Sequence, residues 1–109
     1  LYGLAYELGL EVLVEVHDEE EMAAVQAVHP KILGVNNRNL KTFDVDLQTV
    51  ARLKPYAPKD AIFVSESGIR NHLDMQTVRR LGADAVLIGE TLMRSGNIAC
   101  TLAQLREDV

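Results

Sequence analysis

Polar or small residues close four successive predicted strands of this chain. They are Glu15, Asn36, Glu66 and Gly89. Carboxylates can transfer protons or balance a developing charge, an amide can hydrogen-bond a hydroxyl group, and a glycine lets the backbone approach an anion. Because the carboxyl ends of parallel strands meet at one edge of a sheet, these positions predict a single polar reaction site at that edge.

The elements that must position these residues alternate between strand and helix along the chain. Apolar runs predict four strands, near residues 11–16, 32–36, 61–66 and 84–89. The runs are apolar on both faces, which is typical of a parallel sheet buried on both sides. The period of two along a strand places the four strand-end groups on one face, so we expect helices to cover the other.

Residues 1–109 therefore predict one α/β unit of parallel βα repeats. Four such repeats, preceded by the end of a helix, amount to half of a (β/α)8 TIM barrel. An open four-stranded sheet would need helices on both faces, whereas right-handed crossovers place all of them on one face. The chain begins at Leu1, inside a predicted helix and without an initiator methionine, so we expect it to be a piece of something longer.

Capping residues mark where the predicted helices begin. Asp18, with Glu21 three residues later, predicts a helix near 19–28 through a capping box. Asp46 predicts the start of another helix near 47–54.

Composition argues against several kinds of partner. The formal net charge of −5 disfavours a nucleic-acid surface, which would need a basic stripe. No apolar run approaches the ~20 residues of a membrane-spanning helix, and no secretory signal pattern is seen. The single cysteine, Cys100, fits a reducing compartment, so we expect a cytoplasmic protein. The histidines lack metal-ligand spacing, and we expect neither a metal nor a cofactor.

Four ordered segments resemble the second half of the indole-3-glycerol-phosphate synthase family. They are residues 15–18 (EVHD), 34–40 (GVNNRNL), 65–69 (SESGI) and 87–93 (LIGETLM). The resemblance covers essentially the whole chain and implies a (β/α)8 barrel of which this chain holds strands five to eight. It also implies a lyase of tryptophan biosynthesis. Such an enzyme closes the indole ring of 1-(2-carboxyphenylamino)-1-deoxyribulose 5-phosphate with loss of carbon dioxide and water.

The resemblance assigns catalytic roles to the polar strand-end residues. It implies that Glu15, Asn36 and Glu66 are catalytic, with Glu15 as an acid, a base or a charge-stabilising group. Arg38 would bind the anthranilate carboxylate through a planar, bidentate contact, although a solvated loop arginine is an equally good interpretation. Leu87 would contact the substrate. Asn37 and Asn39 read instead as turn formers, outside the catalytic set.

The same resemblance implies a phosphate cradle in two loops. Its residues would be Ser67, Gly68, Gly89 and Glu90, with Ser67 also contacting the rest of the substrate. A carboxylate beside a phosphate is unfavourable unless its side chain turns away, so we assign only the backbone amide of Glu90 to the cradle.

The family's catalytic lysines have no counterpart at the strand ends of this chain. Lys31, Lys41, Lys54 and Lys59 all lie elsewhere, so we expect the chain alone to be inactive. Two alternatives stay open: another phosphate-binding barrel, such as a related tryptophan- or histidine-pathway isomerase, and a non-catalytic half-barrel. Glu15 together with Asn36 and Arg38 argues against the first.

A half-barrel would also leave apolar surface uncovered. Its inner face would expose Leu13, Val64 and Leu87, and its strands near 11–16 and 84–89 would have unpaired edges. We therefore expect the chain to associate with itself.

Overall fold

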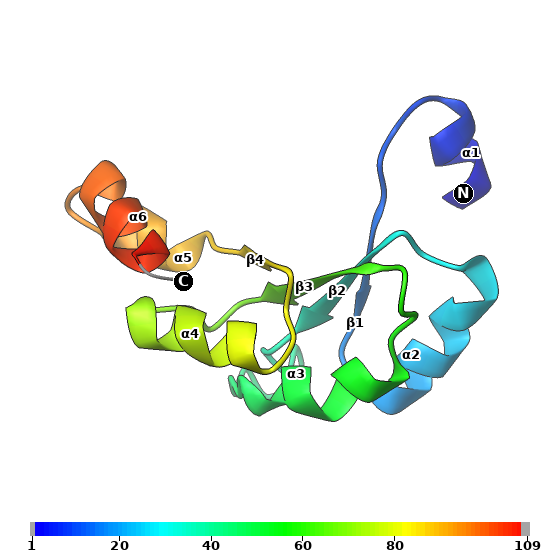
Figure 1. Cartoon of the computed structure of the whole chain (residues 1–109), viewed down its shortest axis with the longest axis horizontal. Coiled ribbons are helices and arrows are strands. Elements are labelled where there is room, and N and C mark those ends of the chain that lie inside the picture. The colour runs from blue at the N-terminus through cyan, green and yellow to red at the C-terminus, as the bar shows by residue number, and fades with distance from the viewer. Residues whose placement is uncertain (1, 108–109) are drawn as a thin grey trace.

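The computed structural model describes residues 2–107 and shows four parallel strands alternating with helices (Figure 1). The strands are β1 (Leu13–Val16), β2 (Ile32–Asn36), β3 (Ile62–Glu66) and β4 (Ala85–Leu87). The α-helices are α1 (Tyr2–Glu7), α2 (Glu19–Val25), α3 (Gln48–Leu53), α4 (His72–Arg80), α5 (Glu90–Arg94) and α6 (Ile98–Arg106). Two 3-10 turns, η1 (Gln26–Val28) and η2 (Lys54–Tyr56), extend α2 and α3.

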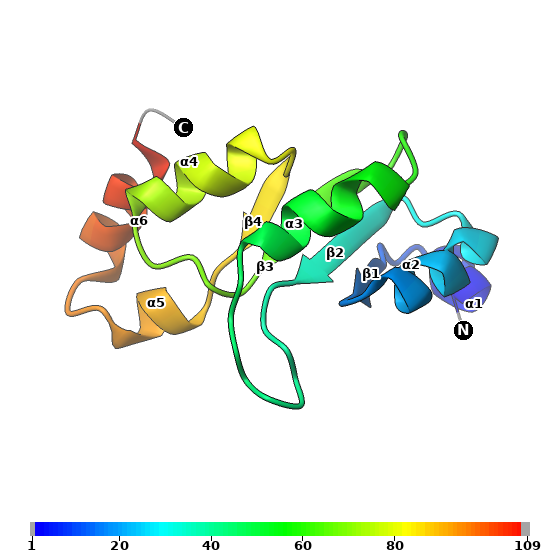
Figure 2. The ribbon, with the colours of Figure 1, turned by 90° about the horizontal axis from the view of Figure 1, so that it is seen from below.

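The strands lie in the order β1-β2-β3-β4, so strands that follow one another in the chain are neighbours. All three pairings are parallel. Helices α2, α3 and α4 line up across one face of this sheet (Figure 2). This is the predicted arrangement of parallel βα repeats, half of a TIM barrel.

Side-chain caps begin helices α2, α4 and α6, as the sequence predicts for α2. The Asp18 carboxylate accepts a hydrogen bond from the Glu21 amide at 2.8 Å, and the Glu21 carboxylate accepts one from the His17 amide at 2.8 Å. These reciprocal bonds satisfy amides that a helix start leaves without partners. The prediction that Asp46 caps the next helix is wrong, because the N-cap of α3 is Leu47, without a side-chain cap; the Asp46 carboxylate accepts the Gln48 amide at 2.9 Å just before the helix.

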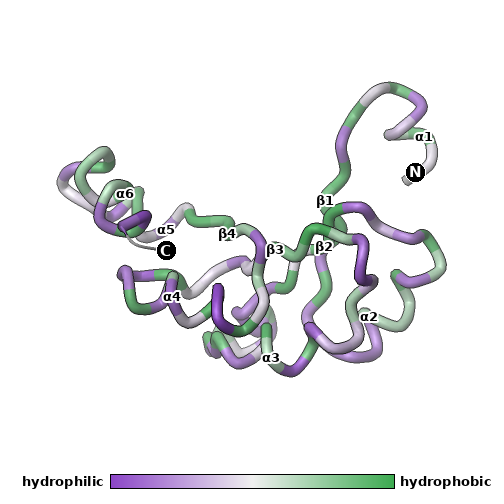
Figure 3. The backbone as a smooth tube through the Cα atoms, in the orientation of Figure 1, coloured by the Kyte–Doolittle hydropathy of each residue, from purple (hydrophilic) through white to green (hydrophobic). Residues whose placement is uncertain are grey.

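The hydrophobic core fills the layer between the sheet and helices α2–α4. Strand residues on this side alternate with the polar face, as the period of two requires. The core includes Val16, Leu33, Val35 and Phe63 from the strands and Met22, Val50, Leu53, Met75 and Val78 from the helices. The strands are mostly green and the purple residues are concentrated in loops and helices (Figure 3).

The other face of the sheet is open at its two edges. Leu13 on β1 is 41% exposed and Leu87 on β4 is 52% exposed. The expectation that Val64 shares this exposure is wrong, since Val64 is only 8% exposed. Val64 lies on a central strand, between Gly34 and Ala85 in register, so neighbouring strands shield it.

The two outer strands are shorter than predicted. Strand β1 begins at Leu13, the first residue that pairs with β2. Strand β4 ends at Leu87, so Gly89 lies two residues beyond the strand instead of closing it. An edge strand has a partner on one side only, which explains why its ends leave the ladder first.

No helix in the described part of the chain combines the length and apolarity that crossing a membrane requires.

Candidate functional site

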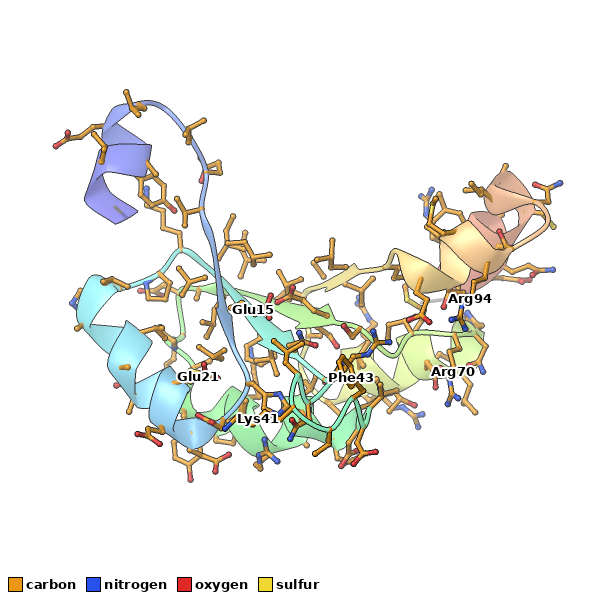
Figure 4. The ribbon with its side chains drawn as sticks, turned by 180° about the vertical axis from the view of Figure 1, so that it is seen from behind. Glu15, Glu21, Lys41, Phe43, Arg70 and Arg94 are labelled. Carbon is orange, nitrogen blue, oxygen red and sulfur yellow. The ribbon has the colours of Figure 1, made fainter. Side chains whose placement is uncertain are left out.

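Glu15, Asn36 and Glu66 come together on the open face of the sheet, at the carboxyl ends of three strands. Glu15 is in register with Gly34, whereas Asn36 is in register with Glu66. The Asn36 side-chain amide spans this stagger and donates a hydrogen bond to the Glu15 carboxylate at 3.0 Å. Glu15 is labelled over the sheet in Figure 4.

Gly34 makes the space in which the Glu66 carboxylate lies. A Cβ atom at Gly34 would lie 2.1 Å from Glu66 Oε2 and 3.1 Å from Leu13 Cδ1. The Glu66 side chain therefore folds back over the glycine toward Glu15. The sequence did not assign a role to Gly34, and a glycine inside a predicted strand was the signal that pointed to a close approach.

Glu66 is the titratable residue whose protonation this arrangement changes most. Burial first, and then the negative charge of Glu15, raise the pKa of Glu66 to about 7. Its Oε2 atom is buried and has no hydrogen-bond partner among the described residues. A carboxyl group with such a pKa holds or releases a proton near neutrality, as acid–base catalysis requires.

The peptide that follows β2 holds Asn36 in its orientation. The Asn36 side-chain oxygen accepts the Arg38 amide at 2.9 Å, while its side-chain nitrogen is committed to Glu15. The backbone oxygen of Asn36 lies 2.8 Å from Nδ1 of the His17 ring. These contacts fix the amide before any ligand arrives.

The two neighbouring asparagines have different roles. Asn39 forms the expected turn, because its side-chain oxygen accepts the Lys41 amide at 2.8 Å and the Thr42 amide at 3.2 Å. Asn37 is not a simple turn former. It is 1% exposed and donates to Ser65 Oγ at 2.8 Å and to the Ser67 backbone oxygen at 3.0 Å, so it ties the loop after β2 to the loop after β3.

A cavity of about 970 Å³ adjoins Glu66. It is bounded by the loop after β2, the loop after β3 and helix α5. Its lining includes Arg38, Glu66, Ser67, Gly68, Arg70, Leu87, Gly89, Glu90 and Arg94. Every residue that the sequence assigned to the substrate or the phosphate lies here, whereas Glu15 and Asn36 stand beside it on the sheet.

The two cradle glycines differ in what surrounds them. Ser67 and Gly68 have left-handed backbones, with φ of 69° and 83°. A Cβ atom at Gly68 would lie 2.5 Å from Val45 Cγ1, so this glycine is needed for packing of the loop after β2. A Cβ atom at Gly89 would meet nothing within 4 Å, so the space beside Gly89 is open.

The side chain of Glu90 is held by two arginines. Arg38 Nη2 lies 2.6 Å from Glu90 Oε2, and Arg94 Nη2 lies 2.9 Å from Glu90 Oε1. Hydrogen bonding to Arg38, and then the positive charge of Arg94, hold the pKa of Glu90 below its ordinary value. Arg38 is therefore not a freely solvated arginine, because its guanidinium group is paired with the Glu90 carboxylate.

Arg70 and Arg94 are cavity residues that sequence reasoning missed. Both side chains are nearly four-fifths exposed, and Figure 4 labels both of them. Arg94 lies four residues after Glu90, and this helical spacing was the signal that paired them. No three His, Cys, Asp or Glu side chains of residues 2–107 gather as ligands of a metal ion would.

Comparisons with known proteins agree on one family. The profile of the family described as indole-3-glycerol phosphate synthase matches residues 1–105. A protein of that name from Ruminiclostridium cellulolyticum is 57% identical over 99 residues, which cover 91% of this chain and 38% of the relative. Another from a Geobacillus species is 44% identical over 110 residues, covering 100% of this chain and 43% of the relative. The chain thus spans about 40% of the length of these relatives.

Solved structures share the fold at low sequence identity. The Amycolatopsis orientalis BexX/CysO complex matches with a TM-score of 0.72 and 21% identity, over 95% of this chain and 43% of that one. A structure titled "Native KDPGal structure" matches with a TM-score of 0.68 and 18% identity, over 93% of this chain and 47% of that one.

Proposed function

The chain belongs to the indole-3-glycerol phosphate synthase family, and on this premise we propose that its site binds and converts a phosphorylated carboxyphenylamino-deoxyribulose. The reaction closes an indole ring and releases carbon dioxide and water. The observation that carries the proposal is the cluster of Glu15, Asn36 and Glu66 beside a cavity that both glycine loops line.

The phosphate group would bind between the loop at Ser67-Gly68 and the turn at Gly89-Glu90. Both loops face the same cavity, and the side of Gly89 is open. Loops after the last strands of barrels present backbone amides that suit a phosphate. The arginines that line the cavity would add positive charge around the anion.

The carboxylate pair would perform the proton transfers of the dehydration step. Ring closure needs an acid that protonates the ribulose carbonyl oxygen, which becomes a hydroxyl group, and loss of carbon dioxide then restores the aromatic ring. The hydroxyl group leaves as water, which needs an acid for the leaving oxygen and a base for a proton of the new ring. Glu66, with its pKa near 7, can hold a proton for donation. Glu15, oriented by Asn36, would stabilise positive charge on the nitrogen of the intermediate and accept a proton.

We further propose that this chain alone forms no product, because no lysine of residues 2–107 stands at the cluster to donate the proton that ring closure needs. Lys54 Nζ lies 4.9 Å from the centre of the Phe63 ring, on the helix side of the sheet. Lys31 Nζ lies 4.6 Å from the centre of the Tyr6 ring. Neither they nor Lys41 and Lys59 line the cavity beside Glu66.

The exposed thiol of Cys100 supports a reducing, cytoplasmic location for this activity.

Complementation tests the proposal. This chain is assayed for indole-glycerol-phosphate formation alone and together with the remaining part of the Ruminiclostridium cellulolyticum relative, supplied as a second chain. We expect product only from the mixture, and roughly 10²-fold less product when Glu15→Gln or Asn36→Ala replaces the unaltered chain. If both variants gave as much product as the unaltered chain, the cluster would be structural instead.

A further inference from the structure

Glu90 joins two segments that are far apart in sequence and that face the same cavity. Its carboxylate holds Arg38, from the loop after β2, and Arg94, from the last turn of α5. Each carboxylate oxygen is used by a different guanidinium group. Arg38 is thereby paired with a carboxylate of the chain itself.

We propose that Glu90 is an internal ligand of Arg38, which the aromatic carboxylate of the substrate displaces on binding. The inference rests on the proposed function, because it takes Arg38 as the residue that receives this carboxylate. It assigns the Glu90 side chain a role in selecting ligands, in addition to any contact of its backbone amide with phosphate.

The exposure of the pair makes the exchange feasible. The side chains of Arg38 and Glu90 are 33% and 47% exposed, so water already screens their attraction. A ligand carboxylate offers the same planar, two-oxygen geometry to the guanidinium group. The ligand therefore replaces one charge-assisted hydrogen bond with another.

Arg94 remains a partner of the Glu90 carboxylate after Arg38 has been released. It lies on the same helix, four residues on, and already holds the second carboxylate oxygen at 2.9 Å. When Arg38 turns to the ligand, Glu90 keeps this partner, so its negative charge is not left unpaired beside the phosphate cradle. The cost is that every carboxylate must compete with Glu90, which favours ligands that also gain energy from a second anionic group.

A titration with 2-aminobenzoate tests the competition. Binding is followed through the Arg38 side-chain Nε–Hε signal by NMR, in the unaltered chain and in Glu90→Gln. We expect 2-aminobenzoate to bind about two- to fivefold more tightly to Glu90→Gln, the range that loss of one exposed ion pair supports. Aniline, which lacks the carboxylate, should bind the two proteins equally. In an Arg38→Ala background, where binding is followed instead through the backbone amide signals of the cavity lining, Glu90→Gln should bring no gain.

The matched control is Glu11→Gln, which makes the same charge change at an exposed residue that lies outside the cavity lining. Equal or weaker binding of 2-aminobenzoate to Glu90→Gln would overturn the inference. So would a similar gain in Glu11→Gln, or an Arg38 signal that 2-aminobenzoate moves in neither protein. Failure of the proposed function would show separately, as absence of product in the complementation assay, which depends on Glu15 and Asn36.

Discussion

Glu15 and Glu66 lie close together on one face of the sheet, and Glu66 is the one whose pKa is raised. Burial and the charge of Glu15 raise its pKa to about 7. Glu15 instead accepts a hydrogen bond from the Asn36 side-chain amide at 3.0 Å. Residues of one type thus acquire different chemistry because their surroundings differ.

The first prediction concerns the pH dependence of stability. The folded chain holds the Glu66 proton up to a pKa of about 7, whereas an unfolded chain loses it near the ordinary value of 4.5. The folded state therefore binds more protons between these values, and the free energy of unfolding falls as the pH rises through them. Glu66→Gln should remove this contribution and gain on the order of 1–3 kcal/mol at pH 8 relative to the unaltered chain. Urea denaturation at pH 4.5 and pH 8 measures it.

Glu11→Gln is the control for that experiment, since its carboxyl group is exposed. A Glu66→Gln variant with the same pH dependence as the unaltered chain would contradict the assigned pKa.

The second prediction concerns Gly34. In Gly34→Ala, the new methyl group would collide with Glu66 Oε2, which is the mobile end of a side chain. We expect Glu66 to swing away from Glu15 into solvent, and its pKa to fall toward the ordinary value. Titration of the side-chain carboxyl carbon by NMR measures the shift. Gly96→Ala is the control, because a Cβ atom there would meet nothing within 4 Å. An unchanged Glu66 pKa would contradict the prediction, because it would mean that the backbone of β2 shifts and the Glu66 side chain stays in place.

At the scale of elements, the loops after β2 and β3 form one packed unit. The buried Asn37 side chain bonds to Ser65 and to the Ser67 backbone. Gly68 packs against Val45 and Leu47. The shape of the cavity thus depends on a loop–loop contact as well as on the strands.

The third prediction contrasts the two glycines of the cradle. Gly68→Ala would place a methyl group against Val45 in a left-handed backbone, so it should reduce the free energy of unfolding by roughly 1–3 kcal/mol. Gly89→Ala has room and a negative φ of −127°, so stability should change little. Its methyl group would occupy space near the proposed anion, so affinity for inorganic phosphate should fall. Thermal unfolding and an NMR phosphate titration separate the two effects. Similar stability losses in both variants would contradict this distinction.

At the scale of the whole molecule, the sheet is covered on one face only. Helices α2–α4 cover the outer face of the sheet. On the inner face, which is the open face that carries Glu15, Asn36 and Glu66, the side chains of Leu13, Ile62 and Leu87 are each at least two-fifths exposed. The outer edges of β1 and β4 have no neighbouring strand among the described residues. Exposed apolar groups and unpaired strand edges both favour association with another chain.

The fourth prediction is that the chain associates with itself through this face. Sedimentation at micromolar concentration should show a dimer or larger species, and Leu13→Lys should weaken the association because it places a charge on the inner face of the edge strand. Leu73→Lys is the control, since Leu73 is 63% exposed on α4, away from this face. A compact monomer that unfolds cooperatively would contradict the prediction.

Local sequence determined much of this architecture. Hydrophobic runs located the four strands, and β2 matches its predicted bounds of 32–36 because a central strand pairs along its whole length. The Asp18 cap was readable because capping joins residues three apart in the chain. The shared alternation of the strands also predicted that Glu15, Asn36 and Glu66 would lie on one face.

Only the tertiary structure decided how those residues interact. The stagger between β1 and β2 places Glu15 beside Gly34, and this leaves space for Glu66 to fold toward Glu15 and retain its proton. The ion pair between Arg38 and Glu90 joins residues 52 positions apart, so no local spacing reveals it. Local patterns report which groups reach an edge of the sheet, whereas register, burial and charge pairing depend on atoms that meet only after the chain has folded.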